Sequence, residues 1–213
     1  MIQIDNVEVF GWKAAIRGMR NPMNSWEKID SIFNDGYSST GIWLGANDLK
    51  LMKSLSKAGN DHAKFLRMIN VTVDVTAPLY WWKEFDTYKV GTVANSCSTM
   101  HKIHEKEFTL DDFSHEHLLP YPSEEVFTKL VEALNVARNC HLDCQDPITK
   151  KDWWWQMIQL LPSSYNQKRT IQLNYQVLKS MYFARKNHKL DEWRKFCEWI
   201  ENLPYAKELI FNE

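Results

Sequence analysis

The chain has 213 residues, and its 26 Lys+Arg against 27 Asp+Glu give a formal net charge of -1, which excludes bulk electrostatic attraction to a nucleic-acid backbone. With 44% hydrophobic and 25% charged residues and only 7 Gly and 7 Pro, the composition excludes an intrinsically disordered or collagen-like chain. A chain of this length can bury a proper core without disulfides or a structural metal, and we expect residues 1–213 to form one domain.

Membrane and secretion signals are missing from the sequence. No run approaches the roughly 18–20 apolar residues that a transmembrane helix needs, and the stretch MIQIDNVEVFGWK lacks the basic start and apolar run of a signal peptide. We therefore expect a cytoplasmic protein without a membrane partner. The four cysteines do not resemble a disulfide framework, so reduced thiols are expected at Cys97, Cys140, Cys144 and Cys197.

The N-terminal part of the chain shows a strand pattern followed by helical patterns. Alternating apolar and polar residues predict a strand over 2–10, and helices are expected over 24–33 and 47–58. Asn34-Asp35-Gly36 is a turn signal between the two helices. For the second helix, Asn47 is the expected N-cap and Gly59 the expected end.

The segment from 69 to 101 joins a strand, a helix and a loop. Four apolar residues alternate strictly with polar ones and predict a strand over 69–76 with one buried face. Pro78 suits the first turn of a helix that runs to about Tyr88. The hydroxyl-rich residues 90–100 (VGTVANSCSTM) predict an irregular loop of the kind that often carries binding.

The C-terminal half is expected to be mainly helical. A capping arrangement at Thr109 and Asp112 precedes four expected helices, over 123–138, 150–160, 166–186 and 190–202. Together with the two strands, these helices predict an α+β fold, with a small, mostly antiparallel central sheet and a helix-rich C-terminal half.

A mixed stripe on the expected 166–186 helix is the first candidate site. Asn174, Leu178, Met181, Arg185 and His188 are spaced by four, three, four and three residues and therefore share one edge. A guanidinium and an amide on one edge suit a nucleotide, because arginine donates in parallel to phosphate or carbonyl oxygens and asparagine both donates and accepts. The competing interpretation pairs Arg185 with Asp191 or Glu192 at the end of the helix.

A second candidate site lies in the block that begins at Ala77 and ends at His101. Lysines, hydroxyls and an amide in this block could form a polar cradle for a phosphate: Lys83, Lys89, Thr92, Asn95, Ser96 and Ser98. Only Gly91 is present where a phosphate-binding loop has several glycines, so the preferred interpretation is a serine-rich loop that satisfies its own backbone.

Metal, thiol and surface interpretations are also open. His101 with His104, His115 with His117, and Cys140 and Cys144 around His141 supply ligand types without a paired zinc pattern, so we expect no metal site. Cys97 has no recognisable base and is expected to be a small buried residue. If Trp153-Trp154-Trp155 is helical, its rings fan over roughly 200°, so one ring should face away from the core and contact another subunit, unless the helix is buried on all sides.

Three segments in fixed order carry a resemblance to a known family. Residues 49–65 (LKLMKSLSKAGNDHAKF), 69–101 and 161–193 resemble, in turn, three parts of the flavin-dependent thymidylate synthases, the ThyX family. These parts are a helix with a Gly-His-x-x-Pro-Phe-like stretch, a strand with an Ala-Pro turn and the signature loop, and a Leu-Pro-x-Ser-x-Tyr opening with its following helix. His62 and Phe65 are approximate matches in the first segment.

The resemblance implies roles for several residues. Asn174, Leu178 and Arg185 fall on family positions that contact flavin or the pyrimidine nucleotide, and His188 is one residue short of a family histidine. It therefore implies nucleotide binding by Lys89, Asn95, Ser96, Ser98, Asn174 and Arg185, and cofactor binding by His62, Leu178 and His188. It further implies a homo-oligomer, by resemblance a tetramer.

The family signature itself is degraded. Thr87-Tyr88-Lys89 stands where the family has Arg-His-Arg, Lys83-Glu84 replaces an Arg-Gln pair, and Met100 replaces a further arginine. Each lost charge-assisted bond to an anion removes roughly 1.5–3 kcal/mol. The leading hypothesis is thus a nucleotide-binding protein that has lost standard synthase activity. One version of it is a phage or mobile-element protein that sequesters a nucleotide signal.

Two alternatives remain open at the level of the sequence. One is a divergent FAD-dependent enzyme that modifies a pyrimidine nucleotide, with a nicotinamide donor and a folate or other one-carbon source. The other is a protein-interaction module in which the Trp-rich surface binds a protein and the nucleotide pocket is filled by side chains.

Overall fold

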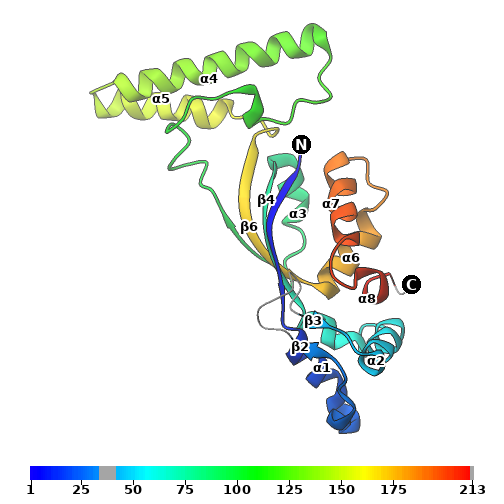
Figure 1. The fold of residues 1–213 in the computed structure, drawn as a ribbon. Helices are drawn as coiled ribbons and strands as arrows, with labels where there is room; N and C mark the ends of the chain where they lie inside the picture. The colour runs from blue at the N-terminus through cyan, green and yellow to red at the C-terminus, as the bar shows by residue number, and fades with distance from the viewer. Residues whose placement is uncertain (34–41, 212–213) are drawn as a thin grey trace. The chain divides into compact units, whose positions relative to one another are not determined.

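A four-stranded antiparallel sheet runs through the computed structural model, which describes residues 1–33 and 42–211 (Figure 1). The strands stand in the order β1-β4-β6-β5, with bounds β1 Gln3–Phe10, β4 Asn70–Pro78, β6 Asn166–Asn174 and β5 Val93–Ser96. The fold combines this sheet with helices, so the expected α+β class is confirmed. The expected turn at Asn34-Asp35-Gly36 lies outside the described residues.

The chain divides into two compact units, and each strand of the sheet contributes residues to both. Unit 1 comprises Met1–Gln3, Thr76–Phe85 and Ser96–Arg169. Unit 2 comprises Ile4–Val75, Asp86–Asn95 and Thr170–Glu213. Within the described residues, no helix is both long enough and apolar enough to cross a membrane.

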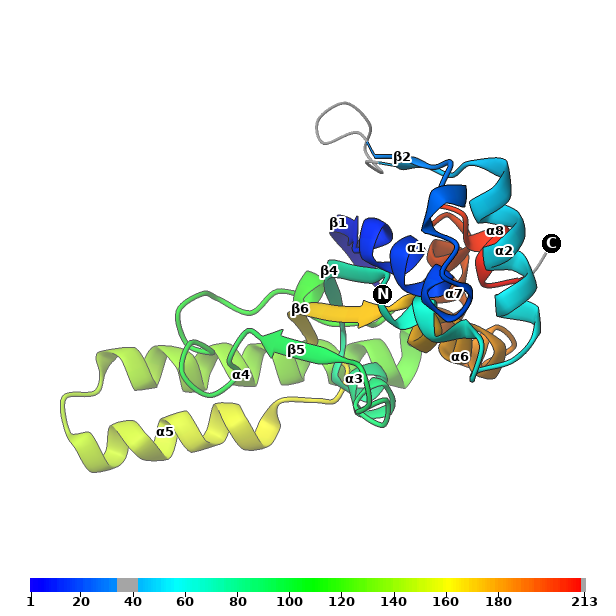
Figure 2. The ribbon, with the colours of Figure 1, turned by 90° about the horizontal axis from the view of Figure 1, so that it is seen from below.

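Strand β4 follows the alternation of its sequence. Val71, Val73 and Val75 are completely buried, while the polar residues between them are partly exposed. Pro78 is the last residue of β4 instead of the first of the helix, and α3 runs over Leu79–Phe85. The expected loop 90–100 contains the short strand β5, so that part of the loop prediction is wrong; β5 pairs with β6 at the edge of the sheet (Figure 2).

Unit 1 is built around a pair of long helices. Helices α4 (Glu125–Asp143) and α5 (Pro147–Leu160) lie side by side (Figure 1). They follow the 3-10 turn η4 (Leu110–Asp112), where the expected capping box of Thr109 and Asp112 is present, and the π-helical turn η5 (Pro120–Glu124). The buried cluster of this unit consists of Ile103, Phe108, Phe113, Val131, Leu134, Ala137 and Met157.

The three consecutive tryptophans lie on α5 and point in different directions, as helical geometry requires. Trp153 and Trp154 pack against the buried cluster, and the indole nitrogen of Trp154 donates to the backbone oxygen of Met100 at 3.0 Å. Trp155 keeps 41% of its surface exposed. One ring of the run therefore faces away from the core of unit 1.

Unit 2 holds the remaining helices. They are α1 (Trp12–Arg20), α2 (Ala46–Lys57), α6 (Tyr175–Arg185), α7 (Asp191–Glu201) and α8 (Ala206–Leu209), with the 3-10 turns η1 (Asn21–Met23), η2 (Trp26–Lys28) and η3 (Ala63–Arg67). Strands β2 (Ile32–Phe33) and β3 (Ile42–Trp43) form a small separate sheet. The helix expected over 24–33 is wrong, because only η2 and β2 form there; α1, with four buried apolar residues on one face, was not expected.

The long helix expected over 166–186 is also corrected. Residues Asn166–Asn174 form strand β6, in which Ile171 and Leu173 are buried and Thr170 and Gln172 are exposed, the period-two pattern of a half-buried strand. Helix α6 begins only at Tyr175, with Asn174 as its N-cap. The part of the mixed stripe from Leu178 to Arg185 therefore lies on one helix, whereas Asn174 lies at the junction of β6 and α6.

Candidate functional site

A cavity of about 460 Å³ in unit 2 brings together two of the segments that the sequence had singled out. One wall is the segment 87–91 after α3, and the opposite wall is the first turn and a half of α6. We call this cavity the amide pocket, because side-chain amides and cations supply most of its polar groups. The amides belong to Asn60, Asn174 and Gln176, the cations are Arg67 and Lys89, and Ser180 adds a hydroxyl.

Asn174 has a double role in the amide pocket. Its Oδ1 accepts a hydrogen bond from the backbone N–H of Val177 at 3.1 Å and so caps α6. The bond uses the acceptor end of the amide and leaves the two N–H donors of Nδ2 for another partner. Because the capped residues are the first of an 11-residue helix, the pocket also receives the partial positive charge of the helix N-terminus.

The charged groups of the amide pocket are both cations. Arg67 and Lys89 line it, and neither has an ion-pair partner within the part of the chain that the structure describes. No aspartate or glutamate is among the described residues that line the cavity. The Oδ1 of Asn60 accepts from Nε2 of Gln176 at 3.1 Å, which orients both of these amides. A cavity of this kind favours a ligand that carries negative charge and several hydrogen-bonding groups.

Gly91 brings the two walls close together. Its φ of +76° lies in the left-handed region, and a Cβ at this position would stand 2.9 Å from Nδ2 of Asn174 and 3.2 Å from Cγ2 of Val177. Only glycine combines this backbone conformation with such a close approach. The glycine is thus needed for the shape of the amide pocket, whereas the phosphate-binding interpretation had looked for glycines that are absent.

Arg185 lies in unit 2 but does not line the amide pocket. Its Nε donates to the hydroxyl of Tyr88 at 3.0 Å, and its guanidinium carbon is 4.9 Å from the ring centroid of Trp193. Tyr88, by contrast, does line the pocket. The structure brings the Arg185 side chain to two aromatic rings, and its expected contact with a nucleotide stays a prediction.

The serine-bearing part of the expected cradle belongs to unit 1. Ser98 lines a smaller cavity of about 300 Å³ together with Cys97 and Tyr165. Its hydroxyl accepts from the backbone N–H groups of Met100 and His101, both at 3.1 Å. These bonds agree with the interpretation in which the serine-rich loop satisfies its own backbone. Two aspartates and two lysines also line this cavity: Asp111, Asp112, Lys106 and Lys168. Because Lys106 is paired with Asp112 and the charges balance, the cavity is less suited to an anion than the amide pocket.

The other members of the cradle are placed as follows. Asn95 and Ser96 lie on β5 with exposed side chains, and Cys97 is exposed, so the expectation that it is buried is wrong. Lys83 is an exposed residue of α3. Of the six residues proposed for nucleotide binding, the amide pocket contains Lys89 and Asn174.

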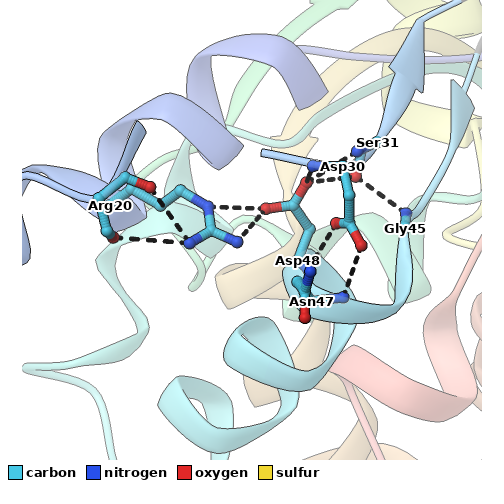
Figure 3. A network of polar contacts seen from close by, with 7 residues as sticks. Arg20, Asp30, Ser31, Gly45, Asn47 and Asp48 are labelled. Atoms are coloured by element: carbon cyan, nitrogen blue, oxygen red, sulfur yellow. Dashed lines mark hydrogen bonds and ion pairs between the residues drawn. The ribbon is translucent and has the colours of Figure 1, made fainter. Parts of the chain in front are cut away.

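A larger cavity of about 860 Å³, also in unit 2, lies between η1, α2 and η3. We call it the Arg20 cleft, after the buried arginine in its wall. Nε and Nη2 of Arg20 bind Oδ1 of Asp48 at 2.8 and 2.6 Å, and the two side chains are 4% and 0% exposed (Figure 3). The contacts of Nη1 with the oxygens of Ser25 are long, at 3.4 and 3.5 Å.

The carboxylates behind Arg20 are saturated with donors. Oδ2 of Asp48 accepts from the backbone N–H groups of Asp30 and Ser31, both at 3.0 Å, and from the Ser31 hydroxyl at 2.7 Å (Figure 3). Asp30 in turn accepts from the N–H groups of Asn47 and Asp48 and so caps α2 from outside the helix. Burial raises the pKa of Asp30, but these backbone hydrogen bonds outweigh it and bring the pKa below its ordinary value.

The expectation for Asn47 is corrected by this network. Gly45 is the N-cap residue of α2, Asn47 lies inside the first turn, and the cap is supplied by Asp30 from an earlier segment. Gly59 follows the end of the helix with a φ of +101°, as expected. The cap is thus a tertiary contact that local sequence does not reveal.

The residues expected to bind a flavin do not line one common cavity among those described here. His62 is exposed on the rim of the Arg20 cleft, and Leu178 is completely buried within α6. Nδ1 of His188 accepts from the backbone N–H of Leu190 at 3.2 Å. Since Leu178 is already covered within a single chain, these residues do not fit FAD as a set.

The described histidines and cysteines form no metal-binding group. Within residues 1–33 and 42–211, no group of three or more His, Cys, Asp or Glu side chains could hold a metal ion. The rings of His104 and His141 stand 4.8 Å apart, and burial, followed by the neighbouring His141, lowers the pKa of His104. Burial, with the charges of Glu201 and Glu198, raises the pKa of Cys197 to about 12, so this thiol is not a nucleophile at neutral pH.

Several residues of the amide pocket were not predicted from the sequence. Asn60, Arg67 and Gln176 are isolated polar residues without motif spacing, and a continuous helix over 166–186 hides the helix start that places Gln176. The alternation of Thr170, Ile171, Gln172 and Leu173 is the signal that could have revealed this start.

Comparison with known proteins adds the fold. No protein-family model and no curated protein matches the sequence. A crystal structure of thymidylate synthase X (ThyX) from Helicobacter pylori with FAD and dUMP matches with a TM-score of 0.68 and 15% identity over 99% of this chain and 97% of that chain. A second structure of the Helicobacter pylori flavin-dependent enzyme, also with FAD and dUMP, matches with a TM-score of 0.65 and 16% identity over 97% and 98%.

The chain has the ThyX fold. The fold that the three segments had implied is therefore confirmed over nearly the whole length. Since fold does not imply activity, the ThyX fold leaves the ligand and the reaction to be argued from the site.

Proposed function

We propose that this ThyX-fold protein binds a nucleotide or nucleotide-like small molecule in the amide pocket. The observation that carries the proposal is the lining of that pocket, in which two cations and three amides meet at a helix N-terminus without any carboxylate among the described lining residues. The solved structures with the same fold contain dUMP, which makes a pyrimidine nucleotide the first ligand to test.

The lining groups divide naturally between the two ends of such a ligand. Lys89 and Arg67 supply the charge that attracts a phosphate. Nδ2 of Asn174 and of Asn60 can donate and Oε1 of Gln176 can accept, which suits the edge of a base or a ribose hydroxyl. A volume of about 460 Å³ lies in the range of small-molecule sites.

In this proposal, the protein no longer catalyses the standard synthase reaction. Thr87-Tyr88-Lys89 in the wall of the pocket supplies one cation, where the family pattern has two arginines and a histidine. Fewer charges around the anion mean weaker transition-state stabilisation, and lysine does not reproduce the two parallel donors of arginine. Retained binding without that reaction supports a role in sequestering a nucleotide or a nucleotide signal.

The resemblance to ThyX also supports proposals on domain organisation, localisation and oligomeric state. The whole chain acts as one ThyX-like domain in the cytoplasm and assembles into a homo-oligomer, by resemblance a tetramer. Exposed Trp155 on α5 is the best placed of the three consecutive tryptophans to contact another subunit. In the oligomer, neutral donors to the ligand would come from Asn95, Ser96 and Ser98, in addition to the positive charge of Lys89.

The test is a thermal-shift and calorimetric screen of the purified protein against dUMP, UMP, cyclic nucleotides and inorganic phosphate. A ligand present at 100 times its dissociation constant should stabilise the fold by about 2.7 kcal/mol. Stabilisation by a nucleotide but not by phosphate alone supports the proposal. Failure of every nucleotide to stabilise the protein would contradict it.

The same preparation tests the flavoenzyme alternative. Visible flavin absorbance that survives extensive dialysis, or returns after incubation with FAD, would favour a divergent FAD-dependent enzyme that modifies a pyrimidine nucleotide. Mass spectrometry of the small molecules released by denaturation identifies the ligand in either case.

A further inference from the structure

Arg185, the last residue of α6, is held between two aromatic rings. Its guanidinium carbon lies 4.9 Å from the ring centroid of Trp193 and 5.7 Å from that of Tyr88, both within cation–π range. The two rings contact each other edge to face, with centroids 6.0 Å apart. Trp193 is completely buried in α7, so the platform under the guanidinium is fixed by the core of unit 2.

A directed hydrogen bond fixes the orientation of Tyr88. Nε of Arg185 donates to the Tyr88 hydroxyl at 3.0 Å. Arginine has no acceptor, so the phenolic oxygen must act as the acceptor in this pair, and the angle of the ring is set by the guanidinium. The Thr92 hydroxyl donates to the backbone oxygen of Tyr88 and holds the same residue by its main chain.

Tyr88 belongs to the wall of the amide pocket, and Arg185 does not. The five consecutive residues 87–91 line the cavity, and Lys89 is one of them. With Tyr88 held at one end of this segment and Gly91 seated against Asn174 at the other, the position of Lys89 is set from both sides. A residue outside the cavity thereby controls the geometry of a residue inside it.

We propose that Arg185 is a positioning residue of the amide pocket, which acts on the ligand through Tyr88 and the 87–91 segment. The inference rests on the proposed function, because it assigns a role in nucleotide binding at that site. It differs from the role that the family resemblance implies for Arg185, which is direct contact with the ligand.

The binding test is a double-mutant cycle with dUMP, using Arg185→Gln, Tyr88→Phe and the double variant. Tyr88→Phe removes the hydrogen bond but keeps the ring, so it should fold even where Arg185→Gln does not. Each single substitution is expected to weaken dUMP binding about tenfold, the effect of one charge-assisted hydrogen bond, and the double variant no more than the weaker-binding single variant. Losses that multiply to about a hundredfold would show direct contact and overturn the inference.

A ligand-free measurement separates the inference from the proposed function. Trypsin cleaves after Lys89, and both Arg185→Gln and Tyr88→Phe should accelerate that cleavage relative to the other tryptic sites, as mass spectrometry of the fragments can measure. Lys186→Gln is the matched control, because Lys186 follows Arg185 but lies over the rings of Tyr182 and Phe183. Its cleavage rate after Lys89 should equal that of the wild type.

The outcomes are distinguishable. If the wild type binds no nucleotide but cleavage after Lys89 is accelerated by both substitutions, the proposed function fails and Arg185 still holds the 87–91 segment. If cleavage is unchanged in both variants, Arg185 does not position this segment and the inference is overturned, whatever the binding result.

Discussion

Two of the cavities in the described part of unit 2 contain arginine and lysine, but they differ in whether a carboxylate neutralises the arginine. The Arg20 cleft is the larger, at about 860 Å³ against about 460 Å³, and has a buried arginine in its wall. That arginine is already paired with Asp48, whose carboxylate is further neutralised by two backbone N–H groups and a hydroxyl. In the amide pocket, Arg67 and Lys89 face no carboxylate among the described lining residues.

The volume of a cavity does not by itself identify the ligand site. A buried ion pair has its Coulomb energy satisfied inside the protein, so a ligand anion that approached Arg20 would have to compete with Asp48. Cations without an internal partner retain their attraction for a ligand. We therefore propose the smaller cavity as the nucleotide site and expect the Arg20 cleft to serve the stability of the fold.

The largest effect should come from breaking the ion pair of the Arg20 cleft. Asp48→Asn leaves the Arg20 charge buried without its carboxylate, and removal of one partner of a buried pair costs about 3–5 kcal/mol. Urea denaturation measures this loss of unfolding free energy.

The exposed pair of Lys129 and Glu125 on α4 supplies the control for that experiment. Its side chains are 67% and 55% exposed, so Glu125→Gln should change stability by only about 0–1 kcal/mol. Equal losses in the two variants would mean that Arg20 is solvated and that the contrast between the cavities is wrong.

The next effect concerns the cations that line the amide pocket. Lys89→Gln should weaken dUMP binding about tenfold, because it removes a charge that lies opposite no carboxylate of the pocket lining. Lys64→Gln makes the same change in the Arg20 cleft and should leave dUMP binding unchanged. Calorimetric titration compares the two, and the loss for Lys89→Gln should shrink as salt screens the charge. An equal loss for Lys64→Gln would place the nucleotide in the wrong cavity.

A smaller effect is expected from the close approach at Gly91. Both Gly91 and Gly59 have positive φ, at +76° and +101°, but only a Cβ at Gly91 would meet other atoms. Each alanine substitution should cost about 1–2 kcal/mol for the left-handed backbone. Gly91→Ala should additionally displace Asn174 and weaken dUMP binding, whereas binding by Gly59→Ala should match the wild type. Matching affinities for both variants would show that the Gly91 contact does not shape the pocket.

The smallest effect is a dependence of stability on pH that belongs to the Arg20 cleft. The pKa of Asp30 lies below its ordinary value of 3.8 in the folded protein, so folding favours the carboxylate. The resulting stabilisation is complete above pH 3.8 and is lost as the pH falls through the folded-state pKa. Urea denaturation between pH 3 and 6 should show a decline that is reduced in Asp30→Asn. An identical decline in that variant would assign the loss to other carboxylates.

The contrast between β4 and β6 shows what a sequence pattern can and cannot establish. In β4, Val71, Val73 and Val75 give an unbroken alternation, and the predicted strand is present. In β6, the alternation of Ile171 and Leu173 runs without a break into the apolar residues of α6, and the combined segment resembles one long helix. Strand pairing decides between the two patterns, since each segment is locally compatible with either.

The amide pocket shows the same division at the level of single residues. Lys89 and Asn174 were predicted because they lie in segments with a recognisable resemblance, and the structure brings both into one cavity. Asn60, Arg67 and Gln176 belong to no such pattern, and their role follows only from their position around the cavity. The sequence grouped Ser98 with Lys89 and Asn174, yet Ser98 lines a cavity of unit 1.

The α+β class, most of the helices and the two segments that line the amide pocket can be predicted from the amino-acid sequence, because periodicity and turn residues act over a few neighbouring positions. Which cations are neutralised depends on the folded structure. Asp48 lies 28 residues from Arg20 and Tyr88 lies 97 residues from Arg185, so no local pattern reveals either pair. Charge in a protein is felt through space, and the chain must fold before an arginine has a partner.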